Sequence, residues 1–269
     1  MRLFCIQEFW FMSVVSILHL AAAALAAFLA GAINSVAGGG TLISFPTLIW
    51  LGLPSIIANA TSTVAIWPGS LGSIWGFRRE IRQLEPRVLL LAIPSFIGGA
   101  AGATLLRFTP PAVFDRLVPF LILFATILFT AQAPIQRRLN LRHQAIHRSA
   151  GWLTLAMTFQ LFVGLYGGYF GAGIGIMMLS ALSILGMNDI LKMNALTSIL
   201  ALCINGVAAA LFILNHMVRW HYVAVMAVAA IIGGYGAAGL ARRVGRSIIR
   251  RFVIAVGFSI AVVLFIKMA

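Results

Sequence analysis

Acidic residues are almost missing from this sequence. Among its 269 residues there are only five Asp and Glu, and charged residues of both signs make up 9% of the chain. A soluble domain averages about 25% charged and about 45–50% apolar residues. This chain is 62% hydrophobic, with a mean hydropathy of +1.05. The composition therefore excludes a soluble enzyme and a disordered chain, and it indicates an all-α polytopic membrane protein.

Cysteines and catalytic motifs are also scarce. The two cysteines, Cys5 and Cys203, lie far apart, so we expect free thiols and no disulfide framework. The sequence has no zinc-protease, serine-hydrolase, P-loop or Cys-x-x-Cys pattern. His143 and His147 have a helical metal-binding spacing but no acidic or cysteine partner in their Arg-rich segment. We predict no enzyme activity, no metal site and no cofactor.

The chain does contain ten apolar runs, of which most are long enough to cross a bilayer. They lie at 12–36, 41–52, 58–77, 88–106, 117–133, 150–170, 174–186, 194–214, 222–241 and 252–268. The first run is too long for a signal peptide, so we interpret it as a membrane helix. The two short runs, 41–52 and 174–186, each follow a glycine cluster. Because glycine is a poor helix interior, the sequence predicts two glycine-broken helices, whose short pieces either cross or re-enter the membrane.

The two halves of the chain repeat each other in order. The matching residues, at an offset of 133 to 135, are Gly31, Gly38, Gly40 and Ile43 with Gly164, Gly171, Gly173 and Ile176, then Asn59-Ala60 with Asn194-Ala195, and Gly98-Gly99 with Gly233-Gly234. Ordered matches over almost the whole chain indicate two repeats of about five helical segments each. We predict a first transmembrane repeat at 1–133, a basic cytoplasmic linker at 134–149 and a second repeat at 150–269.

The net charge of +14 comes from arginine clusters between the apolar runs. The loops 78–87, 134–149 and 242–251 hold four, four and five Arg, whereas 107–116 and 215–221 hold two and one. If each repeat crosses the membrane an odd number of times, thirteen Arg lie on one side and three on the other. This split satisfies the positive-inside rule and makes the two repeats inverted in topology. Both termini then lie outside the cytoplasm, and we expect no nucleic-acid binding.

Neutral polar residues accompany both glycine breaks. A helix that starts after a break presents unpaired N–H groups, and its dipole favours an anion there. Two such starts, at Thr41 and Ile174, would hold a small anion near the midplane without any buried Lys or Arg. The predicted substrate-binding residues are Asn34, Gly38, Gly39, Gly40, Thr41, Asn59, Thr61, Ser62, Gly171, Gly173, Asn194, Thr197 and Ser198.

Other glycines have a simpler interpretation, since small residues let membrane helices approach closely. We predict such a packing role for Gly98, Gly99, Gly102, Gly233, Gly234 and Gly236. Pro68-Gly69 lies inside the third run and predicts a kink, either as a hinge or as a packing feature.

The motifs around the first break resemble those of a known family. GAINSVAGGG at 31–40, LGLP at 51–54 and ANATSTVAIWPG at 58–69 are similar to the sulfite exporter TauE/SafE family of membrane permeases, and GLYGGYFGAGIG at 164–175 resembles its second copy. The second copy departs from the pattern, because Gly171-Ala172-Gly173 replaces a triple glycine. The resemblance implies a multi-pass permease of the bacterial inner membrane for a small anion, such as sulfite, a sulfonate or another sulfur-containing or organic anion.

Together these features predict a secondary transporter that works by alternating access between two inverted repeats. Its expected partners are the anionic substrate and membrane lipid, and the exposed apolar faces would also allow a homodimer. Two alternatives remain open at this point: a passive anion channel, and a membrane scaffold or assembly protein with no transported ligand.

Overall fold

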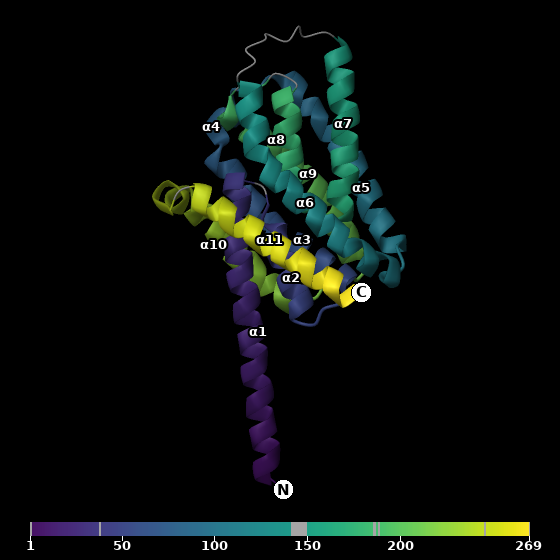
Figure 1. Cartoon of the computed structure of the whole chain (residues 1–269), viewed down its shortest axis with the longest axis vertical. Helices are drawn as coiled ribbons and strands as arrows, with labels where there is room; N and C mark the ends of the chain where they lie inside the picture. Colours follow the sequence, from purple (N-terminus) through teal and green to yellow (C-terminus); the bar gives the residue numbers. More distant parts are fainter. Residues whose placement is uncertain are drawn as a thin grey trace.

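The computed structural model describes the backbone of residues 2–37, 39–140, 150–184, 187, 189–244 and 246–268, and most side chains within 17–34, 39–131, 151–235 and 254–266. This part of the chain is built from helices and short loops, with no strand (Figure 1). The protein is an all-α polytopic membrane protein, as the composition predicts.

Each apolar run of the first half corresponds to a helix. The helices are α1 (Arg2–Ala37), α2 (Thr41–Trp50), α3 (Ser55–Gly76), α5 (Ala92–Phe108) and α6 (Pro111–Asn140), with the short α4 (Arg78–Ile81) and the 3-10 helix η1 (Pro86–Leu91) between α3 and α5. Prolines mark several starts: Pro54 precedes α3, and Pro111 is the first residue of α6. Proline suits these positions because the first turn of a helix does not need its missing N–H.

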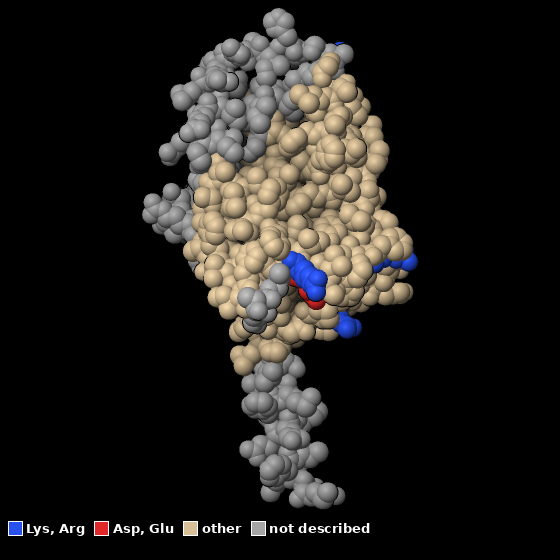
Figure 2. All heavy atoms as spheres, turned by 45° about the vertical axis from the view of Figure 1, so that its right-hand side comes forward, with Lys and Arg blue, Asp and Glu red and all other residues tan. Residues whose placement is uncertain are grey.

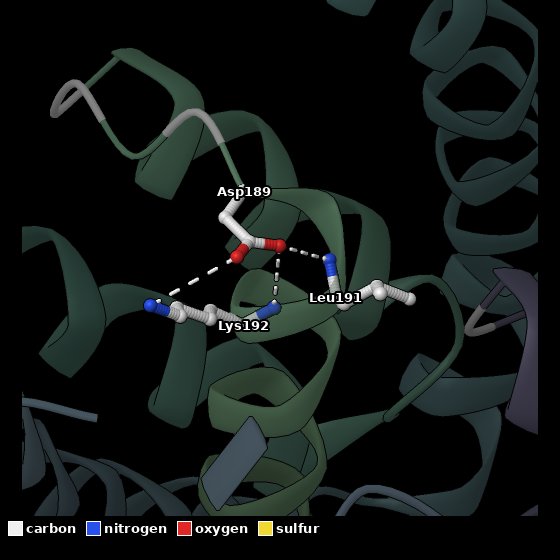
Figure 3. A network of polar contacts seen from close by, with 3 residues as sticks. All are labelled: Asp189, Leu191 and Lys192. Carbon is white, nitrogen blue, oxygen red and sulfur yellow. Dashed lines mark hydrogen bonds and ion pairs between the residues drawn. The ribbon is translucent and has the colours of Figure 1, made fainter. Parts of the chain in front are cut away.

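The second half repeats this order. Its helices are α7 (Ala150–Tyr169), α8 (Ile174–Ile184), α9 (Ile190–Leu214), α10 (Trp220–Val244) and α11 (Arg246–Met268). The start of α9 is capped by Asp189, whose Oδ1 accepts hydrogen bonds from the N–H groups of Leu191 (3.0 Å) and Lys192 (3.3 Å) (Figure 3). The Lys192 ammonium lies 4.0 Å from the other carboxylate oxygen.

Four helical stretches among the described residues are long and apolar enough to cross a membrane: Ile17–Asn34, Pro86–Phe108, Pro111–Leu128 and Leu191–Leu214. By contrast, α2 has 10 residues and α8 has 11. At 1.5 Å per residue each is about 15 Å long, about half of a bilayer core. Figure 1 shows α8 in the upper part of the helical bundle and α2 in its lower part. Each is therefore a half-length helix that begins in the interior.

The helices of the two repeats interlock rather than forming separate bundles. α1 packs against α10, and its counterpart α7 packs against α5; α3 packs against α10, and its counterpart α9 against α5. At the crossing of α3 and α9, Trp67 Nε1 donates to the Leu202 carbonyl at 3.2 Å. These two residues occupy equivalent places in the repeats, 135 positions apart. The α3–α9 crossing therefore joins equivalent places of the two halves.

Glycines allow the interlocking helices to approach. The carbonyl of Leu161 on α7 occupies the position of a Cβ on Gly98, and that of Phe28 on α1 does the same at the equivalent Gly233. The predicted packing role is confirmed at Gly98, Gly99, Gly102 and Gly233. Pro68 lies inside a continuous α3, and Gly69 packs near the Ala230 carbonyl.

One face of the molecule carries a broad belt without charge. On the face shown in Figure 2, most of the described acidic and basic side chains lie near the lower end, a basic group shows at the upper edge, and the tan surface between them carries no charge. Large apolar side chains are exposed on the molecule, including Leu155, Phe162, Val228 and Val262. Such a belt matches the hydrocarbon core of a bilayer.

The ends of the helices divide between two sides. In Figure 1 both chain termini and the α2–α3 connection lie toward the lower end, whereas α4, the end of α6 and the start of α7 lie at the upper end. The Arg-rich segment 78–87 contains α4. Within the predicted linker, α6 continues to Asn140, and residues 141–149, with His143 and His147, lie outside the described part. The division of the chain at 134–149 stays a prediction.

Candidate functional site

The first break separates α1 from α2 at Gly39 and Gly40, both of which are buried. Gly40 has a helical conformation, with φ −62° and ψ −30°. Its need for glycine is spatial, because the Ala30 carbonyl of α1 occupies the position of a Cβ. The side chain of Asn34 closes this break: its Oδ1 accepts the Gly40 N–H at 2.8 Å. Gly38 lies outside the described residues.

The start of α2 is also tied down within the chain. The Leu42 N–H donates to the Gly39 carbonyl at 3.1 Å, and the Ile43 N–H to the Gly40 carbonyl at 3.0 Å. Thr41 is buried beside them. In this conformation the oxygen of Asn34 serves the protein itself, so a direct role for Asn34 in substrate binding stays a prediction.

The second break needs glycine for a different reason. Gly171 and Gly173 have φ values of +77° and +80°, in the left-handed region that side chains disfavour. The Tyr166 hydroxyl donates to the Ala172 carbonyl at 2.9 Å and holds the irregular segment in place. Beyond it, the Ile176 N–H donates to the Gly173 carbonyl at 3.0 Å. Backbone of this kind is tolerated at membrane depth only where protein or a cavity surrounds it.

Helix α3 joins the two breaks. The Asn59 Nδ2 donates to the carbonyl of Tyr169, at the end of α7, at 3.0 Å. The Ser62 and Ser44 hydroxyls share a hydrogen bond of 2.7 Å, which links α3 to α2. Asn59, Ser62 and Ser44 are all buried. The structure therefore brings together the first break, the second break and two of the predicted α3 residues.

Thr61 faces another direction. At 100° per residue, residues 59 and 61 point about 160° apart around α3, whereas residues 59 and 62 point only about 60° apart. The Thr61 Oγ1 accepts the Arg219 N–H at 3.1 Å, which ties α3 to the loop before α10. Thr61 is buried in this contact, so the structure does not bring it together with Asn59 and Ser62.

The predicted residues of α9 are arranged less symmetrically. The Ser198 hydroxyl donates to the Asn194 carbonyl at 2.8 Å, and both residues are half-buried. Thr197 is buried, and its hydroxyl has no hydrogen-bond partner among the described residues. Thr197 is the repeat equivalent of Ser62, but the equivalent of Ser44 is Met177. The missing partner follows from this difference between the halves.

Three further polar groups escaped the sequence-based prediction. Asn205 on α9 places its Oδ1 3.9 Å from the position that a Cβ on Gly171 would take. The buried Gln160 donates from Nε2 to the Ser95 hydroxyl at 2.8 Å, which links α7 to α5. For Asn205 and Gln160, the sequence signal that could have found them is an amide side chain inside an apolar run. The equivalents of Gln160 and Ser95 in the other half are alanines, Ala27 and Ala230.

The core around the breaks is neutral. The buried polar side chains among the described residues are Thr, Ser, Asn and Gln, without a buried charge. Aromatic rings surround the second break: the Phe45 ring of α2 lies edge-on to Phe170, with centroids 5.2 Å apart, and Phe124 packs against Tyr166 at 5.7 Å. No group of three His, Cys, Asp or Glu that could hold a metal occurs in the described part.

A lateral groove of about 410 Å³ lies between α2 and α11. Its lining includes Pro46, Trp50, Ile260 and Val263 and is mostly apolar. None of the predicted site residues contributes to it, so the groove is separate from the breaks.

Known proteins are similar to this sequence over most of its length. The family model of the sulfite exporter TauE/SafE matches residues 23–264. A probable membrane transporter protein of Haemophilus influenzae is 30% identical over 234 residues, which are 86% of this chain and 88% of that protein. The probable membrane transporter protein YfcA of Escherichia coli K12 is 29% identical over 244 residues, 90% of this chain and 88% of YfcA. None of the solved structures matches the chain.

Proposed function

Since the chain belongs to the sulfite exporter TauE/SafE family, we propose that it is a membrane transporter that moves a small anion, of the sulfite or sulfonate type, by alternating access. It acts as a carrier rather than as an enzyme. The bacterial inner membrane is its proposed location.

The observation that carries this proposal is the pair of helix starts at the breaks. α2 and α8 are half-length helices that begin in the protein interior, and α3 is hydrogen-bonded to both break regions through Ser62 and Asn59. The N-terminus of a helix carries a partial positive charge of about half an elementary charge. Two of them attract an anion into a core that has no buried cation among the described residues.

Outward transport needs no coupled ion. An inside-negative membrane potential favours the exit of an anion by about 2.3 kcal/mol per charge per 100 mV. The interlocked repeats would supply the moving parts, since α1 packs against α10 as α7 packs against α5, and inverted repeats of this kind move against each other in alternating access.

The test is ligand-induced stabilisation of the purified protein, followed by flux in proteoliposomes. A ligand at one hundred times its Kd stabilises the folded state by about 2.7 kcal/mol. We expect a selective rise in Tm with one member of a panel of sulfite, sulfate, thiosulfate, sulfoacetate, taurine, acetate and chloride, and counterflow of that anion. Large currents without counterflow would support a passive channel instead. An absence of both stabilisation and flux would support a scaffold.

The variant that tests the site is Asn59→Ala combined with Asn194→Ala. We expect at least a tenfold lower flux of the transported anion, because both repeats lose an amide beside the proposed path. The control is Thr158→Ala, which removes an exposed hydroxyl on α7 that donates to the Thr154 carbonyl of the same helix. Unchanged flux in the double variant would contradict the proposed site.

A further inference from the structure

The side-chain oxygen of Asn59 is an unexplained group in the interior. Asn59 is only 1% exposed, and its Oδ1 has no hydrogen-bond partner among the described residues. Buried polar atoms almost always have a partner, so a missing one indicates a place for a ligand, an ion or water.

The direction of this oxygen follows from the other half of the same amide. The Nδ2 donates to the Tyr169 carbonyl, and a carbonyl can only accept, so the nitrogen must face Tyr169 and the oxygen must face away from it. The two atoms of one amide lie about 2.2 Å apart. The Asn59 amide as a whole is therefore held at the point where α7 ends and the second break begins, with its oxygen on the side away from Tyr169.

The surroundings of that point suit an anion. Gly171 and Gly173, both with positive φ, interrupt the helix there. α8 then begins at Ile174 with the positive end of its dipole toward the break. The Asn205 Oδ1 is close to Gly171 on the α9 side. The start of α8 is five residues after Tyr169, whose carbonyl holds the Asn59 amide, so an anionic head there would lie only a short stretch of chain from the residue that holds Asn59.

The charge of the ligand is limited by the neutral core. The cost of desolvating an ion grows with the square of its charge, and no buried Lys or Arg occurs among the described side chains to offset it. Partial charges at helix ends match one negative charge better than two. An oxygen that only accepts, such as Oδ1, would repel an anion unless the ligand turns an O–H or N–H toward it.

We propose that the substrate binds as a monoanion that carries its own hydrogen-bond donor, with the anionic head at the start of α8 and the donor on Asn59 Oδ1. This inference rests on the proposed function and specifies its substrate class. A diprotic oxyanion then binds in its singly protonated form, and a sulfonate binds more tightly when it bears a hydroxyl or amino group.

The experiment compares anions that differ only in the donor. The Kd values of 2-hydroxyethanesulfonate and ethanesulfonate, and of glycolate and acetate, are measured by titration calorimetry on the full-length protein in detergent. Because a site built for a donor rejects an analogue that lacks it, we expect the hydroxylated member of at least one pair to bind tenfold tighter or more. The apparent affinity for sulfite should also rise as the pH falls through its second ionisation.

A variant assigns the preference to Asn59. In Asn59→Ala the affinity ratio within the pair should fall to about one, whereas Ser95→Ala, which removes a different buried hydroxyl, should keep the wild-type ratio. The comparison of anions on the wild-type protein stands even if Asn59→Ala fails to fold. Equal binding within both pairs, with a pH-independent affinity for sulfite, would overturn the inference and leave the proposed function intact. No binding of any anion would overturn both.

Discussion

Individual residues at the two breaks have different reasons for their identity. Gly40 is glycine because the Ala30 carbonyl leaves no room for a side chain, although its backbone is helical. Gly173 is glycine because its φ of +80° is disfavoured for any side chain. The two glycines occupy equivalent positions in the repeats, so the same residue type meets two physical requirements.

The first prediction, at the residue scale, concerns the packing glycines. Gly98→Ala and Gly233→Ala should each destabilise the protein by about 1–3 kcal/mol, because the new Cβ would overlap a backbone carbonyl of the neighbouring helix. The measurement is the Tm of the purified variants in detergent. Gly72→Ala is the control, since nothing lies within 4 Å of its Cβ position; alanine should be neutral or slightly stabilising there. An unchanged Tm for Gly98→Ala would refute the close approach of α5 and α7.

At the scale of elements, the half-length helices α2 and α8 depend on their neighbours. Each is too short to be stable alone, and each is fixed by contacts near its start. The Ser44–Ser62 hydrogen bond ties α2 to α3, and the Asn59–Tyr169 and Tyr166–Ala172 bonds fix the segment before α8. These few hydrogen bonds therefore hold the starts of both half-length helices in place.

The second prediction, at the element scale, concerns the start of α9. Asp189→Ala should cost about 1 kcal/mol, because two N–H groups of the first turn lose their acceptor. Asp189→Ser should recover most of the loss, since a hydroxyl also caps a helix. Lys192→Ala should change the Tm little, because the ion pair is exposed and 4.0 Å long. If Lys192→Ala is as harmful as Asp189→Ala, the ion pair rather than the cap stabilises this end.

At the scale of the whole molecule, helices of one repeat pack against helices of the other on both sides of the α3–α9 crossing. Trp67 and Leu202, which are equivalent in sequence, touch there. The buried Gln160–Ser95 hydrogen bond between α7 and α5 has no counterpart between α1 and α10. The two halves share their architecture but differ in the polar contacts that hold their crossings together.

The third prediction, at this scale, concerns membrane sidedness. In a background with Cys5→Ala and Cys203→Ala, a membrane-impermeant thiol reagent on intact cells should label Ala112→Cys but not Gln83→Cys. Ala112 lies in an Arg-poor connection and Gln83 in an Arg-rich one, and both are exposed; the positive-inside rule assigns Gln83 to the cytoplasm. Permeabilised cells should label both. Labelling of Gln83→Cys in intact cells would show that the orientation is the reverse of the predicted one.

The sequence was sufficient for the helices because their signals are local. Ten apolar runs, the two glycine clusters and the offset of 133 to 135 between the halves depend only on the order of residues along the chain. The bilayer reinforces these signals, since a spanning segment must satisfy its backbone internally and be about 20 residues long. The all-α polytopic fold and the short helices after the breaks follow from that.

The arrangement of the polar residues was decided by the tertiary structure. Thr61 and Ser62 are neighbours in sequence, yet Thr61 meets the loop at Arg219 and Ser62 meets α2. Asn59 finds the Tyr169 carbonyl 110 positions away, a pairing that depends on which helices cross. Contacts of this range arise from packing between the two halves. In the folded protein they bury Asn59 Oδ1 without a hydrogen-bond partner among the described residues.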